Sequence, residues 1–388
     1  MEAEIFQFEP TGARLIPARL KEAREAKAMS QTDLAQLAKV TPQAISQYES
    51  DDKQPEWNTL MKISQNLDLP ISYFTSERPD GGEITNTAFF RCFKSRTKAT
   101  NKMLRRWSVW AAQTVNYIGA IVNLPAVVVP QPSKKTSYTD EEIEQIATEC
   151  RRLWGLADGP IANMVALLES KGFVVARSEF GVSDADAFSC WQNDRPFIFL
   201  ASDKNCAVRS RFDAAHELGH MILHRHITQS EIEPDNQEML NKIEHEANRF
   251  AAAFLLPAKT FISEIFSSNL QQFVELKKRW KVAIGAMIYR CKDLGVFDEQ
   301  HHINLRKQMS FRKWVKQEPL DDVIPVEQTQ LIGKAIKLII DSGIKTATDF
   351  LIDLRFSVTA LTKIGNFDES ILEIREQQTT YPLILKGS

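Results

Sequence analysis

The sequence predicts a mostly helical α+β fold in three parts: a five-helix N-terminal bundle, a domain with a small sheet, and a helical C-terminal region. Residues 14–75 carry apolar stripes and helix-capping residues at short intervals, which is typical of a compact bundle. Apolar, aromatic-rich runs between 173 and 202 predict the sheet. Helical patterns follow at about 203–225 and 238–255, and residues 301–388 are expected to form small helices and loops.

The composition is that of an ordinary globular protein. The 388 residues include 43% hydrophobic and 25% charged side chains, with a formal net charge of −2, so any DNA contact must come from a local patch. No apolar run reaches the roughly 18 residues that a membrane span needs. The N-terminal segment MEAEIFQFEP lacks the basic and apolar parts of a secretory signal. We therefore expect a cytoplasmic protein with no membrane contact.

The cysteines are scattered along the chain and never form a CxxC pair. This pattern predicts reduced, mostly buried thiols and argues against a cysteine-based zinc site. They are Cys92, Cys150, Cys190, Cys206 and Cys291.

The N-terminal bundle is expected to span residues 13–77. Ser30 is placed to cap a helix over SQTDLAQLA, and Thr41 to cap a second helix that starts with Pro42. The RPDGGE segment at 78–83 has turn chemistry, so we place a domain boundary there.

A second domain is expected over residues 88–300. Its first stretch, 91–106, carries seven basic residues and no acidic one, which suits either a solvated face or an additional contact to phosphate. An apolar helix follows, and 124–137 is extended and linker-like, with three prolines. The QNDR turn at 192–195 joins two of the expected strands into a hairpin.

The strongest motif is HExxH at 216–220, on a predicted helix. His216 and His220 are four residues apart, so both imidazoles lie on one helical face and can reach a single ion. Neutral imidazoles suit Zn²⁺, and three protein ligands leave a position open for water. Glu217 would lie beside that water, where it can take up a proton and pass it to a leaving amine.

The third ligand is expected from one of three candidates. His226 has the metzincin spacing from His220, but that arrangement needs a glycine at the position that Leu223 occupies. Glu244 and Glu246 lie on the following predicted helix. Of these, Glu244 is favoured, and Glu246 and His226 remain as the alternatives.

Small residues near Glu244 support this preference. Ala247 and Ala251 share its helical face, which would let this helix pack closely on the HExxH helix. Asn248, one turn after Glu244, is placed to hydrogen-bond a ligand histidine. His224, one turn past the second motif histidine, is expected to project away along the helix axis.

Two segments surround these residues, RSRFDAAHELGHMILH and IEHEANRFAAAFLLP. They resemble the ImmA/IrrE family of zinc metallopeptidases, and the resemblance covers about 88–300. It implies a zincin-like fold and a gluzincin-like endopeptidase, with His216, His220 and Glu244 as metal ligands and Glu217 as the catalytic residue. It also implies partners that are themselves repressors, cleaved under stress or during mobile-element induction.

Zincins generally hold an extended peptide against the edge strand of their sheet, by backbone hydrogen bonds. From the order of the runs along the chain, RPFIFLAS at 195–202 is expected to be that edge strand. The same run also suits an ordinary structural hairpin, which needs no substrate.

The N-terminal bundle contains the segment MSQTDLAQLAKVTPQAISQYESDDKQPEWNTLMKISQNLDLP. It resembles the helix-turn-helix of XRE/Cro-type repressors. The resemblance places Gln43, Ser46 and Gln47 on the helix that enters the major groove, where glutamine can pair with adenine edges. Thr41 and Lys53 are expected to contact phosphate. The side chains assigned to DNA are Gln31, Thr41, Gln43, Ser46, Gln47 and Lys53.

Two features depart from the usual pattern of such a module. The turn position that is usually glycine is Lys39, which would adopt a positive φ at a modest cost. Residues 14–75 contain eight basic and eight acidic side chains, so weak non-specific affinity for DNA is expected. The alternative is a bundle that binds protein or dimerises.

Two functions are consistent with these motifs. The first is a DNA-binding transcriptional regulator whose zinc endopeptidase domain cleaves a specific partner protein, such as a repressor. The second is a transcription factor whose metallopeptidase-like domain senses a ligand or metal without proteolysis. The unbroken HExxH favours the first, because a pure sensor has no need of Glu217. The expected partners are a double-stranded DNA operator and a protein substrate, and a homodimer is compatible with the sequence.

Overall fold

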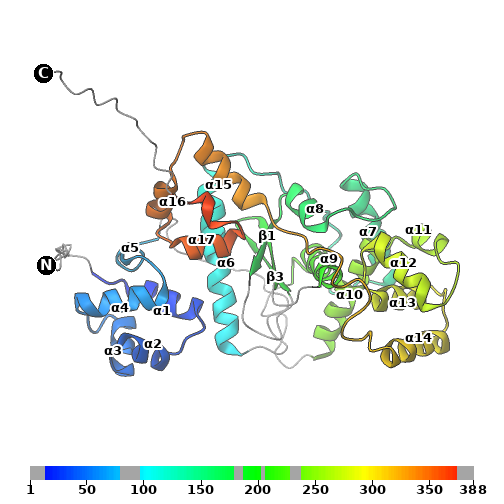
Figure 1. The fold of residues 1–388 in the computed structure, drawn as a ribbon, viewed down its shortest axis with the longest axis horizontal. Coiled ribbons are helices and arrows are strands. Elements are labelled where there is room, and N and C mark those ends of the chain that lie inside the picture. The colour runs from blue at the N-terminus through cyan, green and yellow to red at the C-terminus, as the bar shows by residue number, and fades with distance from the viewer. Residues whose placement is uncertain (1–13, 79–96, 179–186, 202–205, 228–236, 374–388) are drawn as a thin grey trace, which may run out of the picture.

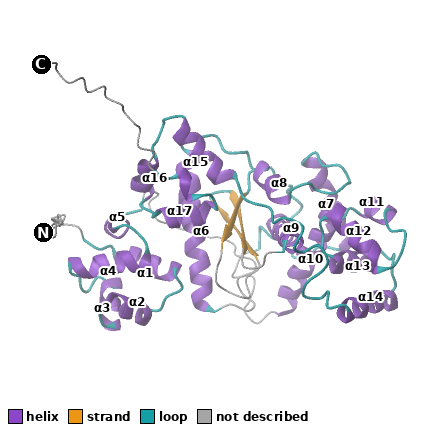
Figure 2. Ribbon diagram, viewed as in Figure 1, coloured by secondary structure: helices purple, strands orange, loops and turns teal. Residues whose placement is uncertain are grey.

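The computed structural model describes residues 14–78, 97–178, 187–201, 206–227 and 237–373. Helices make up most of this part and surround one small sheet, which confirms the predicted α+β class (Figure 1, Figure 2). Among the described residues, no helix is both long and apolar enough to cross a membrane.

Five helices form the N-terminal bundle, as predicted. Capping follows the sequence signals, because the Ser30 hydroxyl accepts from the Asp33 backbone N–H and the Thr41 hydroxyl from that of Ala44. Lys39 has a φ of 58°, so the turn of the motif contains the expected left-handed non-glycine residue. The helices are α1 (Pro17–Ala26), α2 (Gln31–Ala38), α3 (Pro42–Glu49), α4 (Trp57–Leu67) and α5 (Ile71–Thr75).

Helix α6 (Lys98–Gly119) joins the bundle to the rest of the chain (Figure 1). Toward the bundle, Trp110 donates its indole N–H to the Glu22 carboxylate of α1 across 3.2 Å. Toward the C-terminal region, Gln113 donates to the backbone oxygen of Leu354 across 3.4 Å. One hydrophobic cluster therefore runs from the bundle through α6 to the C-terminal helices and one face of the sheet.

The sheet has the strand order β1-β3-β2, with β1 (Val174–Ser178) parallel to β3 (Arg195–Ala201). β2 (Ala187–Gln192) is antiparallel to β3, and the two form the predicted hairpin. Asn193 and Asp194 in its turn have φ angles of 47° and 59°. Two successive left-handed residues make the tight turn whose twist matches that of the flanking strands.

The prediction that RPFIFLAS forms the edge strand is wrong. Residues 195–201 of this run form β3, which lies in the centre of the sheet, paired with β1 on one side and β2 on the other. The order of strands along the chain is misleading because β2 follows β1 in the sequence but β1 pairs with β3, which therefore lies between them. In the described sheet β2 is an edge strand, and it packs against α9 (Ala207–Leu223).

Helix α9 also packs closely against α10 (Gln237–Leu255), and α10 in turn packs against α7 (Asp140–Leu153). A second hydrophobic cluster fills the space between these helices, the other face of the sheet and the helices that follow. The remaining helices of this part are α8 (Met164–Ser170), α11 (Ala258–Ser263), α12 (Leu270–Trp280), α13 (Ile284–Asp293) and α14 (Glu299–Phe311).

The cysteines of the described residues agree with the predicted thiols. Cys150, Cys190 and Cys291 are free and buried, and Cys206 is free and half-buried. Cys92 lies outside the described residues, as does the first part of the basic stretch at 91–106.

The C-terminal helices fold back onto the first half of the chain and pack on α6 and β1. The Tyr117 hydroxyl of α6 donates to the Asp353 carboxylate across 2.5 Å. The Arg355 guanidinium donates to the backbone oxygen of Glu77, just after the bundle. These elements are α15 (Leu331–Asp341), α16 (Ala347–Leu354), α17 (Val358–Gly365) and the 3-10 helix η1 (Glu369–Ile371).

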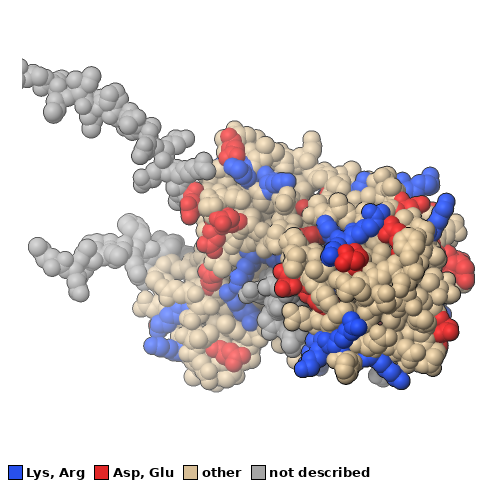
Figure 3. Space-filling view, turned by 45° about the vertical axis from the view of Figure 1, so that its right-hand side comes forward, with Lys and Arg blue, Asp and Glu red and all other residues tan. Residues whose placement is uncertain are grey.

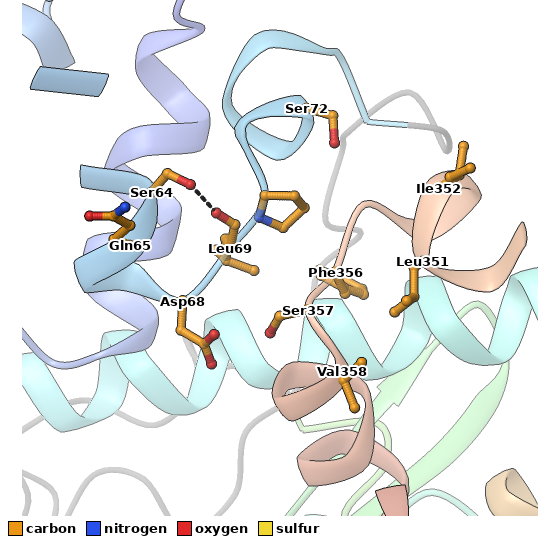
Figure 4. Close-up of a pocket in the computed structure, with 11 residues that line it drawn as sticks. Ser64, Gln65, Asp68, Leu69, Ser72, Leu351, Ile352, Phe356, Ser357 and Val358 are labelled. Carbon is orange, nitrogen blue, oxygen red and sulfur yellow. Dashed lines mark hydrogen bonds between the residues drawn. The ribbon is translucent and has the colours of Figure 1, made fainter. Parts of the chain in front are cut away.

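A pocket of about 480 Å³ remains where the C-terminal helices meet the bundle (Figure 4). Asp68 and Leu69 line it from the bundle, and Phe356 and Val358 line it from the opposite side. The Ser64 hydroxyl donates to the backbone oxygen of Leu69 across 2.6 Å and closes one wall. Segments almost 300 residues apart in the chain, at 64 and 358, therefore share one surface.

Candidate metal centre and DNA-binding surface

Helix α9 places both motif histidines in the protein interior, where His216 is 2% and His220 0% exposed. The helix is able to approach α10 closely at Gly219. A Cβ atom on Gly219 would lie 3.1 Å from the backbone oxygen and 3.2 Å from the Cα of Ala247. Because both helices carry small residues at this crossing, Glu244, one turn before Ala247, comes within reach of the histidines. The expected packing role of Ala247 is confirmed.

Three donor side chains converge between these helices. The Nε2 atoms of His216 and His220 are 3.0 Å apart, and the carboxylate oxygens of Glu244 lie 3.6 Å and 3.5 Å from them. Ligand atoms about 2.0–2.1 Å from a tetrahedral zinc ion are about 3.3 Å from one another. The donors therefore fit three corners of such a site. Within the described ranges, they form the one cluster of this kind.

The far nitrogens of both imidazoles have hydrogen-bond partners, which leaves the Nε2 atoms for a metal. His216 Nδ1 is 2.9 Å from Asn248 Oδ1, so the predicted role of Asn248 is confirmed. His220 Nδ1 is 3.1 Å from His224 Nδ1. Because an amide oxygen only accepts, His216 carries its proton on Nδ1. The same tautomer of His220 donates to His224, an assignment that we infer from the hydrogen bonds.

Glu246 stands at the far end of this chain of hydrogen bonds. Its carboxylate accepts from His224 Nε2 across 3.0 Å, from the Ser137 hydroxyl across 2.8 Å, and from the Tyr138 backbone N–H across 3.2 Å. Burial raises the pKa of Glu246, but these hydrogen bonds outweigh it and hold the pKa below its usual value. Burial lowers the pKa of His224 to about 4. The pair is therefore an ionised carboxylate and a neutral imidazole at neutral pH.

The other candidate ligands lie outside the donor cluster. The expectation that His224 projects away is wrong, because α9 ends just before this residue and its ring turns onto the far nitrogen of His220. His226 Nε2 lies 2.8 Å from the backbone oxygen of Lys135. Neither His226 nor Glu246 contributes an atom to the cluster, whereas Glu244 does.

Glu217, which follows His216 in α9, is fully buried. Ser189 of the edge strand β2 donates its hydroxyl to Glu217 Oε2 across 2.6 Å. This contact fixes the orientation of the carboxylate and places the edge of the sheet next to it. The carboxylate is thus suited to accept and return a proton beside the metal-binding atoms.

Sequence reasoning missed three residues around this centre. Ser189 is a lone hydroxyl in the apolar run AFSCW, which is the one available signal. Ser137 and Tyr138 lie at the end of the proline-rich segment that has a linker-like composition, and Ser137 is 109 residues before its partner Glu246. No spacing rule links residues so far apart.

The Gly219 crossing leads to a prediction about stability. Replacing Gly219 by Val should lower the free energy of unfolding by about 1–3 kcal/mol, because the added methyl groups must displace the backbone of α10. Zinc affinity should fall as well, since Glu244 moves with α10. Denaturant unfolding and zinc titration measure both effects. Gly159→Val is the control, because a Cβ at Gly159 meets nothing within 4 Å; equal stability of the two variants would contradict the crossing as described.

The residues expected to enter the major groove lie on α3. Gln43 and Ser46 are exposed, and Gln47 is half-buried at the end of the same face. Ile45 and Tyr48 point inward and are buried in the core. The side chains expected in the major groove therefore face solvent together.

The other side chains assigned to DNA divide into two groups. Thr41 and Lys53 are exposed on either side of α3. Gln31, in contrast, donates its amide to the Glu49 carboxylate across 2.9 Å, and Arg24 of α1 binds the same carboxylate across 2.6 Å. The Gln31 side chain thus ties α2 to α3 inside the bundle.

Comparisons with known proteins agree with this organisation. Residues 20–74 match the family model described as helix-turn-helix. Residues 168–292 match the M78 peptidase model, described as the IrrE N-terminal-like domain, and this range includes all the residues of the donor cluster and Glu217. No curated protein matches the chain. The chain joins a helix-turn-helix domain to a metallopeptidase-like domain, which is the architecture of a DNA-binding regulator with a peptidase-like part.

Proposed function

We propose that the chain is a DNA-binding transcriptional regulator whose zinc-dependent endopeptidase site cleaves a specific partner protein, such as a repressor. The observation that carries the proposal is the convergence of His216, His220 and Glu244 beside the buried carboxylate of Glu217. The donor set is the one that zinc prefers, and the hydrogen bonds to the far imidazole nitrogens hold the rings in the required tautomer.

Zinc held by these residues would polarise a peptide carbonyl as a Lewis acid and make a nearby water more acidic. In the proposed reaction Glu217 takes a proton from the water whose oxygen attacks the carbonyl carbon. It then gives this proton to the amide nitrogen as the carbon–nitrogen bond breaks. Ser189 keeps the carboxylate oriented by donating to one of its oxygens.

The substrate peptide is proposed to lie along β2. This strand is at an edge of the described sheet, and its Ser189 contacts Glu217 directly. An extended peptide that adds to this edge by backbone hydrogen bonds would carry its carbonyl groups past the carboxylate. The central strand β3 has neighbours on both sides and offers no such edge.

One observation favours the second candidate, a regulator that senses a ligand or metal without proteolysis. The Glu217 side chain is 0% exposed, whereas a general base needs contact with water and substrate. A sensor would need only the metal-binding residues. The two functions therefore differ in whether a partner protein is cut.

The experiment that tests the proposal is incubation of the full chain with the proteins encoded by neighbouring genes, with and without zinc. Mass spectrometry then identifies new termini. A single cut in one partner that depends on zinc is expected. If the partner proteins stay intact in every mixture although the metal is bound, the peptidase function is contradicted and the sensor function is favoured.

The reading helix gives a prediction about DNA sequence. Gln43→Ala and Gln47→Ala should each reduce discrimination between the selected operator and altered sites by about 1–3 kcal/mol, the usual value of one bidentate hydrogen-bond pair to a base. Lys53→Ala should lower the affinity for all DNA sequences alike, because a contact to phosphate does not depend on the base. Binding-site selection followed by affinity measurements gives both values. The control is Gln65→Ala, exposed on α4; a selection that enriches no sequence would indicate a protein-binding bundle.

A further inference from the structure

The helix-turn-helix domain is short of cations for the DNA backbone. Residues 14–75 carry equal numbers of basic and acidic side chains, eight of each. Two of the arginines are buried in internal ion pairs, Arg19 with Glu22 and Arg24 with Glu49. Non-specific DNA affinity depends on phosphate neutralisation. A regulator built this way needs basic residues from outside the module.

Helix α6 carries a basic stripe, which we define as Lys98, Lys102 and Arg105. Their spacing of four and then three residues places them on one face of the helix. All are exposed, and the Lys102 side chain is 59% accessible. The whole of α6 contains no acidic residue, so the stripe is not neutralised along its own helix.

The basic stripe lies beside the DNA-binding surface. Arg106, next in sequence to the stripe, donates to the Glu25 carboxylate across 2.8 and 2.9 Å, and Trp107 donates to the backbone oxygen of Ala26 across 3.0 Å. These contacts fix the middle of α6 on the last turn of α1, next to Arg24, which binds the end of α3. The lower end of α6 in Figure 1 lies level with α2 and α3. Basic side chains gather beside this domain in Figure 3.

Docking geometry decides which part of DNA this surface would meet. In helix-turn-helix complexes the second helix of the motif enters the major groove, and the first helix crosses the phosphate backbone. Here those helices are α3 and α2. Since α6 is docked where α1 ends and α2 is about to begin, its stripe flanks the path of the backbone and not the base edges.

We propose that the basic stripe of α6 binds the phosphate backbone of the DNA whose sequence α3 reads. The inference deepens the proposed DNA-binding function and rests on it. Lys102 stays mostly exposed although it contacts the Glu25 carboxylate across 3.2 Å, so a phosphate can still reach its ammonium group. The pKa of Glu25 is raised by burial but lowered further by Arg106 and Lys102, so Glu25 stays ionised and holds α6 in place.

The test is the salt dependence of DNA affinity, measured by fluorescence anisotropy between about 50 and 200 mM salt. The probes are a labelled random-sequence duplex and a duplex enriched by selection with the protein. For the triple variant Lys98→Gln, Lys102→Gln, Arg105→Gln, the log–log slope should fall in magnitude by about 0.9 for each phosphate that is no longer neutralised. The affinity ratio between the two probes should stay unchanged, because phosphate contacts do not specify sequence.

Two further variants keep the result interpretable. Replacing both lysines of the stripe by arginine preserves the charge and should preserve the wild-type slope. Removing equal charge at the exposed Arg152, Lys259 and Lys307, on α7, α11 and α14, should also leave the slope unchanged. A wild-type slope for the triple variant would overturn the proposal while DNA binding itself stands. Absence of binding to either probe by the unaltered chain would instead overturn the proposed DNA-binding function.

Discussion

Glu217→Gln is expected to abolish cleavage of the partner protein while the chain keeps its fold and its zinc. Glutamine has nearly the same shape, and its side-chain oxygen can still accept the Ser189 hydroxyl. Glu217 is not in the donor cluster, so the metal-binding atoms are untouched. The variant lacks only the group that moves the proton. Removing such a group commonly lowers the rate by about 10²–10⁴.

The measurement is a time course of partner cleavage, with zinc content and thermal unfolding recorded on the same samples. Glu275→Gln, which removes one exposed carboxylate from α12, is the matched control and should cut at the wild-type rate. In cells, regulation of the target gene should disappear together with cleavage. Normal regulation by Glu217→Gln would contradict the peptidase and favour the sensor.

The second large effect concerns the metal. His216→Ala and His220→Ala should each change the zinc content from one ion per chain to none, because two donors remain of three. Glu244→Ala should weaken binding for the same reason. Glu246→Ala should have a smaller effect, about 10–100-fold in affinity, since Glu246 acts on the metal site through His224.

Metal analysis after gel filtration and competition with a chelator measure these differences. His245→Ala is the matched control, because His245 lies on α10 next to Glu244 in sequence but is exposed and faces Asp140. It should keep one zinc ion. If His226→Ala emptied the site and Glu244→Ala did not, the choice of the third ligand would be wrong.

Local rules predicted the parts of the fold that depend on neighbouring residues. Helical spacing placed His216 and His220 together, and capping chemistry placed the starts of α2 and α3. Small side chains on α10 indicated the close crossing with α9. Each of these signals acts within a turn or two of helix, so the sequence alone contains it.

Features that depend on distant parts of the chain were not predictable. The position of β3 in the sheet follows from its parallel pairing with β1. The turn at 192–195 predicts only the pairing of β2 with β3. The role of Glu246 depends on Ser137, and the direction of His224 depends on Glu246. In each case the partner is selected by tertiary packing, and no pattern of spacing carries that information.

The contacts of α6 with α1 have a consequence for geometry on DNA. Trp110 with Glu22 and Arg106 with Glu25 hold the helix-turn-helix domain against the rest of the molecule through buried carboxylates. On DNA, a chain joined in this way would present the proposed metal centre at one fixed angle around the axis of the duplex. A partner protein bound to the same DNA would face that centre only at one rotational position around the duplex. Inserting about half a helical turn of DNA, roughly 5 base pairs, between the operator and the binding site of the partner would turn the partner to the opposite side of the duplex. Inserting a whole turn would bring it back to the original side.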